Sequence, residues 1–189
     1  LAAITVALMA FVKSGDHVLM ADTVYDPSRR VAQFLETCGV DTTFYDPLIG
    51  PGLEALVKPN TKVVFAESPG SLTFEVQDIP AIAKVAHDHG AKLLLDNTWA
   101  AGYFFKPFDR GVDVSIQAAT KYIAGHADVM IGLVTAKTED DWRAIKTQSA
   151  IMGYCAGPDE CYLTLRGLKT LDVRMQRHQE TGLKLAHWL

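Results

Sequence analysis

The chain has 189 residues, of which 49% are hydrophobic and 21% are charged, and its formal net charge is −4 at pH 7. This composition is typical of a folded globular protein and excludes a disordered, fibrous or membrane-embedded chain. The small negative charge leaves no basic footprint for nucleic acid. A domain of this length buries roughly 70% of the surface of its extended chain, so a hydrophobic core is expected without disulfides or metals.

Cysteine usage and the longest apolar run bear on the cellular compartment. Cys38, Cys155 and Cys161 lack the C-x-x-C spacing of a zinc or redox site, so no metal is expected. The apolar stretch 1–12 is too short to span a bilayer and has neither the charged start nor the cleavage site of a signal peptide. These features predict a soluble protein of the reducing cytoplasm.

The two ends of the sequence predict a piece of a longer protein. The chain begins at Leu1, without a methionine and already inside an apolar helical run. It ends at Leu189 on another helical run that has no stop signal. We therefore expect residues 1–189 to form one partial domain.

Helical and extended patterns alternate along the chain and are separated by glycine or proline. The patterns predict helices over 2–13, 29–37, 53–57, 79–89, 139–152 and from 158 to the end, and strands over 17–21, 42–45, 62–66, 92–95, 112–116 and 130–135. Strands that are apolar on both faces and alternate with helices indicate an α/β three-layer sandwich with a mostly parallel sheet. Ligands bind such folds at the carboxyl ends of the strands.

Asp96 is the first candidate site residue, because it ends a strand that contains three consecutive leucines. A buried carboxylate is costly unless a positive group pairs with it. One interpretation is a helix N-cap, which is a common role for aspartate directly after a strand. The other is a counter-charge for a protonated ring nitrogen.

Lys121 follows the next predicted strand, in the segment AATKY, among small residues. A lone lysine is usually a solvated surface residue, but desolvation at a strand end lowers its pKa and suits a Schiff-base nucleophile. Sites for pyridoxal 5'-phosphate (PLP) combine such a lysine with an acidic partner for the pyridine nitrogen. Lys121 and Asp96, at the ends of successive strands, fit this pairing.

Two neighbouring side chains could complete a PLP site. The hydroxyl of Thr120 suits a phosphate oxygen, although threonine is also an ordinary strand or turn residue. Tyr25 lies in the loop after the first predicted strand, where its ring could stack on a flat cofactor. A half-buried tyrosine of the core is the alternative for that position.

Five blocks, in order, resemble the Cys/Met-metabolism family of PLP-dependent enzymes. They are GDHVLMADTVYDPS (15–28), VVFAESPGS (63–71), LLLDNTWAAG (93–102), DVSIQAATKYIAGHADVMIG (113–132) and LRGLKTLDVRMQRH (165–178). The resemblance implies the large domain of the aspartate-aminotransferase fold. An N-terminal arm and a C-terminal domain of the family subunit lie outside these blocks, and we expect residues 1–189 alone to bind PLP weakly.

The resemblance also implies a role for each candidate. Lys121 would carry the PLP aldehyde and move protons between the substrate Cα and the leaving group. Asp96 would pair with the pyridine nitrogen, Tyr25 would stack over the ring as a catalytic and cofactor-binding residue, and Thr120 would contact the phosphate. Structural roles are expected for Trp99, His126, Asp128, Arg166, Lys169, Arg174 and Arg177.

Two departures from the wider family bear on the reaction. Many relatives have serine where this chain has Ala118, and γ-acting relatives have asparagine where it has Ser71. Both differences favour a bacterial carbon–sulfur lyase that splits cystathionine by β-elimination to homocysteine, pyruvate and ammonia. A γ-acting relative and a non-catalytic or oligomerisation fragment are the alternatives. The implied partners are an amino-acid substrate and further copies in a homotetramer, with no nucleic acid or membrane.

Overall fold

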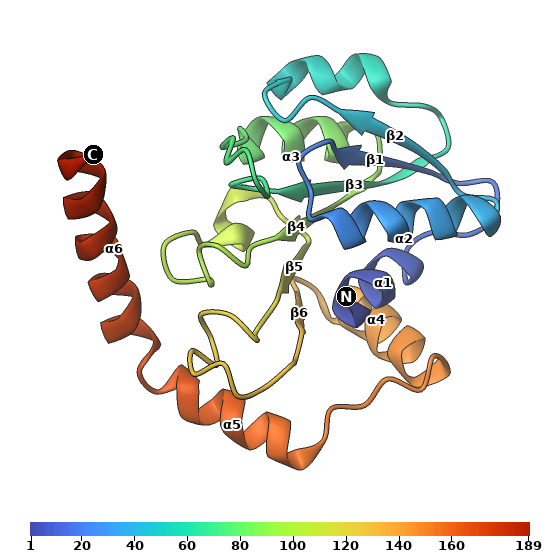
Figure 1. Ribbon diagram of the computed structural model, residues 1–189. Coiled ribbons are helices and arrows are strands. Elements are labelled where there is room, and N and C mark those ends of the chain that lie inside the picture. The colour runs from blue at the N-terminus through green and yellow to red at the C-terminus, as the bar shows by residue number, and fades with distance from the viewer.

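The computed structural model describes residues 1–189 as helices around one six-stranded sheet (Figure 1). The strands are β1 (His17–Ala21), β2 (Asp41–Tyr45), β3 (Thr61–Glu67), β4 (Lys92–Asp96), β5 (Val114–Gln117) and β6 (Leu133–Ala136). The helices are α1 (Ala2–Met9), α2 (Asp26–Thr37), α3 (Ile79–Asp88), α4 (Glu139–Ile151), α5 (Pro158–Leu168) and α6 (Leu171–Trp188), with short 3₁₀ helices η1 (Gly50–Leu56) and η2 (Pro107–Arg110).

The strand order is β2-β1-β3-β4-β5-β6, in which only β6 is antiparallel to its neighbour. The expected mostly parallel sheet is therefore confirmed. The chain moves outward from β1 to β2, returns past β1 to β3, and then continues in the other direction. Right-handed crossovers place α2 and α3 on opposite faces of such a sheet. The resulting switch point, where ligands bind in open α/β sheets, lies between the carboxyl ends of β1 and β3.

Helices cover both faces of the sheet. Helix α1 contacts α2 and α4, and these three lie together on one side, whereas α3 packs with η1, η2 and β4 on the other (Figure 1). Every residue of β1 is buried, and Leu93, Leu94 and Leu95 of β4 have no exposed surface. This double-sided burial explains why the strand sequences are continuously apolar.

Some predicted boundaries differ from the structure for identifiable reasons. Helix α1 ends at Met9 instead of residue 13, and the amide of Lys13 donates to the Asp16 carboxylate, 2.9 Å away. Strand β6 begins at Leu133 instead of residue 130, because Ile131 bonds to Thr120 outside the sheet. These side-chain contacts capture backbone groups that the pattern had assigned to regular elements.

The single helix predicted from residue 158 onward is two helices. The break falls at Lys169 and Thr170, where the Thr170 amide donates to Gly167 at 3.1 Å. Helix α6 then extends away from the body of the protein, and Met175 is its only buried residue (Figure 1). Met175 joins Ala101, Ala119 and Ile123 in a small second apolar cluster.

No helix is long and apolar enough to cross a membrane. The histidine, cysteine and acidic side chains form no group of three or more that could hold a metal ion. The three cysteines are free and exposed.

Candidate functional site

The Asp96 carboxyl lies at the carboxyl end of β4 and is 6% exposed. Its Oδ1 accepts hydrogen bonds from the Thr98 amide at 3.0 Å and the Thr98 hydroxyl at 2.5 Å. The other oxygen, Oδ2, has no partner within the chain. Turns follow β4, so Asp96 caps no helix and the N-cap interpretation is wrong.

Burial raises the pKa of Asp96, and the two hydrogen bonds from Thr98 oppose that shift. No lysine or arginine forms an ion pair with Asp96. A buried carboxyl with one unpartnered oxygen is suited to a positively charged N–H donor from a ligand.

Thr98 is a site residue that the sequence analysis missed. Besides donating to Asp96, its hydroxyl accepts a hydrogen bond from the Ala118 amide at 2.8 Å. Ala118 begins the turn that contains Lys121. Thr98 therefore links the acid after β4 to the lysine turn after β5. The available signal was the D-x-T spacing, in which a side-chain carboxylate commonly bonds two residues ahead.

Lys121 is an exposed residue of this turn beyond β5, so the desolvated position expected for its amine is not found. Its main chain is fixed, because its amide donates to Ala118 at 2.9 Å and its carbonyl accepts from Gly125 at 2.9 Å. Its side-chain amine has no hydrogen bond or ion pair within the chain. A held backbone with a free amine is the arrangement that a covalent amine nucleophile needs.

The hydroxyl of Thr120 already has two hydrogen-bond partners within the chain. Its hydroxyl donates to the Ile131 carbonyl at 3.1 Å and accepts from the Ile131 amide at 2.8 Å. The adjacent Gly132 packs tightly on α1, since a Cβ there would lie 2.7 Å from the Cβ of Ala3. The loop that holds Thr120 thus lies beside the first turn of α1, and a helix amino terminus attracts phosphate. To donate to a phosphate, Thr120 must first release the Ile131 carbonyl.

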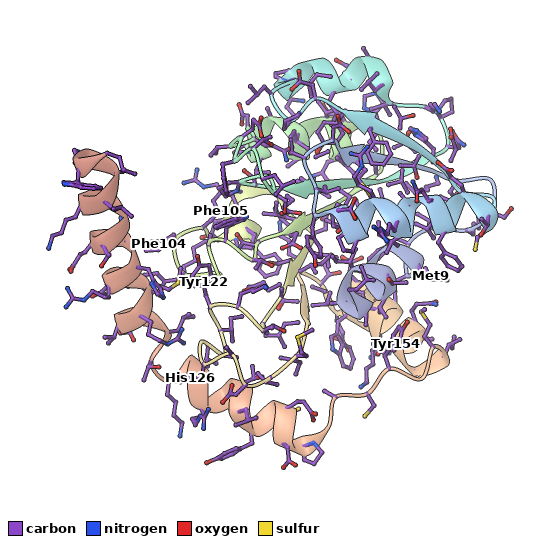
Figure 2. The ribbon with its side chains drawn as sticks, viewed as in Figure 1. Met9, Phe104, Phe105, Tyr122, His126 and Tyr154 are labelled. Atoms are coloured by element: carbon purple, nitrogen blue, oxygen red, sulfur yellow. The ribbon has the colours of Figure 1, made fainter.

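Helices α5 and α6 hold the lysine turn from outside. The Arg174 guanidinium donates to the carbonyls of Tyr122 at 2.5 Å, Ile123 at 3.2 Å and Gly167 at 2.7 Å. Tyr122, labelled in Figure 2, also packs edge-on against His178 with ring centroids 5.6 Å apart. Gly167 approaches the turn so closely that a Cβ would lie 2.0 Å from the Ala124 carbonyl oxygen.

Two of the basic side chains that were expected to be structural, Arg166 and Arg174, make such contacts, whereas Arg177 does not. Arg174 binds main-chain carbonyls, and Arg166 forms an ion pair with Asp128. Arg177 is an exposed residue whose nearest acidic partner is Glu180, 3.5 Å away.

We expect Arg174→Met to lower the free energy of unfolding by about 2–3 kcal/mol, because charge-assisted hydrogen bonds to partly buried carbonyls are lost. Arg177→Met is the matched control, and a change within about 0.5 kcal/mol is expected for this exposed position. Urea unfolding followed by circular dichroism measures both. Equal losses of unfolding free energy in the two variants would contradict the role of Arg174 in holding these carbonyls.

Tyr25 lies at the carboxyl side of β1, directly before α2, and its side chain is 51% exposed. It is therefore not the core tyrosine of the alternative interpretation. Its amide donates to Glu67 Oε2 at 2.8 Å, and Ser71 donates to Glu67 Oε1 at 2.5 Å. Glu67 pairs with Asp96 in the register of β3 and β4. Tyr25 and Asp96 thus lie at one edge of the sheet, each next to Glu67. Glu67 is a second residue that the sequence analysis missed.

Burial, with a smaller contribution from the nearby Asp96 carboxylate, raises the pKa of Glu67 from 4.5 to about 7, against the hydrogen bonds from Ser71 and from the Tyr25 amide. The folded-state pKa thus exceeds the unfolded value. Stability from this group is complete below about pH 4.5 and is lost as pH rises through 7.

We expect the cofactor-free chain to lose about 3 kcal/mol of stability between pH 4.5 and pH 8 relative to Glu67→Gln, which cannot ionise. Urea unfolding of both proteins at pH 4.5 and pH 8 measures this difference. A pH-independent difference would show that Glu67 ionises as freely in the folded chain as in the unfolded one.

Comparison with known proteins identifies the family of the chain. The family described as Cys/Met metabolism PLP-dependent enzyme matches residues 1–189. The chain is 47% identical to cystathionine β-lyase of Escherichia coli and 44% identical to that of Haemophilus influenzae, covering 100% of this chain and 48% of each relative.

A crystal structure of cystathionine γ-lyase from Lactobacillus plantarum, complexed with L-serine, superposes with a TM-score of 0.95 at 34% identity, over 99% of this chain and 49% of that one. The chain thus spans about half the length of the curated relatives it matches. Since the family match extends from the first residue to the last, the chain belongs to the Cys/Met metabolism family of PLP-dependent enzymes.

Proposed function

We propose that this chain is the PLP-binding core of a cystathionine β-lyase, which splits cystathionine by β-elimination to homocysteine, pyruvate and ammonia. One observation carries the proposal: a buried carboxyl with an unpartnered oxygen, Asp96, and a free amine, Lys121, follow adjacent parallel strands. The identity of 47% to the Escherichia coli enzyme of that name supports the choice of reaction.

The residues present fit PLP. The free Oδ2 of Asp96 would accept the pyridine N–H, Lys121 would hold the aldehyde, and the exposed ring of Tyr25 would stack on the pyridine. The first turn of α1, with the hydroxyl of Thr120 once it has left Ile131, would hold the phosphate. When bound, PLP supplies an electron sink for the charge that develops at the substrate Cα.

The chain's own residues would then handle charge and protons. The ionised Asp96 keeps a positive N–H donor bound beside it, since an unpaired buried carboxylate is costly. Lys121 Nζ, which has no competing partner, accepts the proton from Cα and delivers a proton to the departing sulfur. Thr98 keeps the Asp96 carboxyl in place and, through the Ala118 amide, fixes its position relative to the lysine turn.

A γ-acting enzyme is the second candidate, favoured by the likeness to the Lactobacillus plantarum cystathionine γ-lyase. The two reactions release different products from cystathionine. We expect the gene product that contains residues 1–189 to release pyruvate, as measured by coupling to lactate dehydrogenase. Release of 2-oxobutyrate, identified by mass spectrometry, would assign the γ-reaction instead. If the protein releases neither oxo acid, the non-catalytic scaffold is the remaining candidate.

We also propose that the protein acts in the cytoplasm as a homotetramer. Free, exposed cysteines are compatible with a reducing compartment. Apolar side chains of α5 and α6 are exposed and would gain from cover by a second copy; they include Tyr162, Leu165, Val173, Leu183 and Trp188. The mass of the gene product in solution, measured by light scattering, tests the tetramer.

A further inference from the structure

Glu67 lies at the switch point of the sheet, between the loops that follow β1 and β3. Its side chain bridges these loops, because Oε2 accepts from the Tyr25 amide at 2.8 Å and Oε1 accepts from the Ser71 hydroxyl at 2.5 Å. The residue is 4% exposed. Glu67 is also the last residue of β3 and pairs in register with Asp96.

The Glu67 main chain is held equally firmly. The side-chain amide of Gln77 donates to the Glu67 carbonyl at 2.8 Å. Gln77 is itself fixed, because its main-chain N–H donates to Ser68 Oγ at 2.9 Å. The buried hydroxyl of Tyr45 donates to Gln77 Oε1 at 3.0 Å. The carboxylate is therefore presented from a rigid support, and it transmits that rigidity to the segment that begins α2.

A carboxylate is an unusual choice for this position. No lysine or arginine pairs with it, and the charged group that acts on it is the like-charged Asp96 carboxylate, which raises its pKa. Burying an unpaired acid beside another acid costs stability, so packing alone does not explain its presence. A carboxylate offers two acceptor oxygens, and here each one receives a donor from a different loop.

We propose that Glu67 is a positioning residue that fixes Tyr25 relative to Asp96, so that the tyrosine ring meets the plane of a cofactor bound at Asp96. The inference rests on the proposed function, because it concerns Tyr25 as the residue that stacks on PLP. The Tyr25 amide precedes α2 and makes no other hydrogen bond within the chain. Glu67 thus ties the Tyr25 amide directly to the end of β3, while the Ser71 amide, which donates to the Thr23 carbonyl at 2.7 Å, joins the same two loops nearby.

The test measures PLP binding by the gene product that contains this chain, from the absorbance of the bound cofactor and its induced circular dichroism. Glu67→Ala removes the acceptor for Tyr25, whereas Glu67→Gln removes only the charge, because its amide oxygen still accepts and the Ser71 hydroxyl can reverse. We expect Glu67→Ala to bind PLP up to about tenfold more weakly than Glu67→Gln, as for one lost hydrogen bond to a neutral amide oxygen. The dichroism of the bound cofactor should fall in Glu67→Ala alone.

A double-mutant cycle separates positioning from a general structural role. In a Tyr25→Ala background, the PLP affinities of Glu67→Ala and Glu67→Gln should differ by less than about twofold, because no ring remains to be positioned. The same gap in both backgrounds would overturn the inference. If Glu67→Ala does not fold, Glu67→Met, which keeps the length of the glutamine side chain but offers the Tyr25 amide no oxygen, replaces it in the cycle with the same criterion.

Asp113→Asn is the matched control. Asp113 is also a buried acid that accepts a main-chain hydrogen bond, from the Leu93 amide at 2.8 Å, but it precedes β5 and lies at the opposite edge of the sheet. Its substitution should leave the PLP affinity unchanged, and an equal loss there would overturn the assignment to Glu67. Absence of PLP binding by the unsubstituted protein would instead contradict the proposed function and the inference with it.

Discussion

Lys121→Ala is expected to reduce turnover by at least about a thousandfold, since it removes both the amine that holds the cofactor and the base that moves the Cα proton. The amine of Lys121 has no partner within the chain, whereas Lys106 donates its amine to the Gly102 carbonyl at 2.6 Å. The amine of Lys137 has no partner either, but Lys137 follows β6, which is antiparallel to β5, and so lies at the edge of the sheet opposite to Asp96. The position beyond the carboxyl end of β5 therefore distinguishes Lys121.

Borohydride reduction followed by peptide mass spectrometry checks the assignment. In the unsubstituted protein the reduced cofactor should be found on Lys121, and in the variant no lysine should carry it. Lys137→Ala is the control and should retain turnover and labelling. Cofactor trapped on Lys106 or Lys137 in the unsubstituted protein would refute the role of Lys121.

Asp96→Asn is expected to slow Cα deprotonation by about a hundredfold or more while some PLP remains bound. An asparagine keeps an acceptor for the two donors from Thr98, so the local geometry is preserved. The neutral amide cannot, however, keep a ring nitrogen protonated, and the loss should appear in the rate of the chemical step.

The rate of exchange of the substrate Cα proton in deuterium oxide, followed by nuclear magnetic resonance, measures this step directly. Asp113→Asn serves again as the control, since Asp113 is a buried acid at the far edge of the sheet. An Asp96→Asn protein that exchanges the proton at the normal rate would exclude the electron-sink role of this pairing.

The arrangement of the sheet could be predicted from local patterns. The leucines of β4 and the apolar run of β3 are continuous because both faces are buried, and this property is visible in the sequence. The positions of Asp96 and Lys121 follow from it, since Asp96 is the last residue of β4 and Lys121 lies in the turn just beyond β5. Their placement at one edge needs only the parallel order of the sheet.

The contacts that complete the site depend on residues far apart in the sequence. Glu67 meets the Tyr25 amide across 42 positions, and Arg174 reaches Tyr122 across 52. The hydrogen bond from Thr120 to Ile131 likewise depends on the path of the loop between them, which the sequence pattern does not predict. No periodicity reports such pairings, because the partners are chosen by the fold and not by neighbouring residues.

Helix α6 is about 27 Å long, given its 18 residues. Its contacts with the body of the protein come from its first half, through Arg174, Met175, Gln176 and His178. Because Arg174 donates to the Tyr122 and Ile123 carbonyls, a tilt of α6 would displace the turn that carries Lys121. The orientation of this helix and the position of the Lys121 amine are therefore mechanically coupled through the main chain.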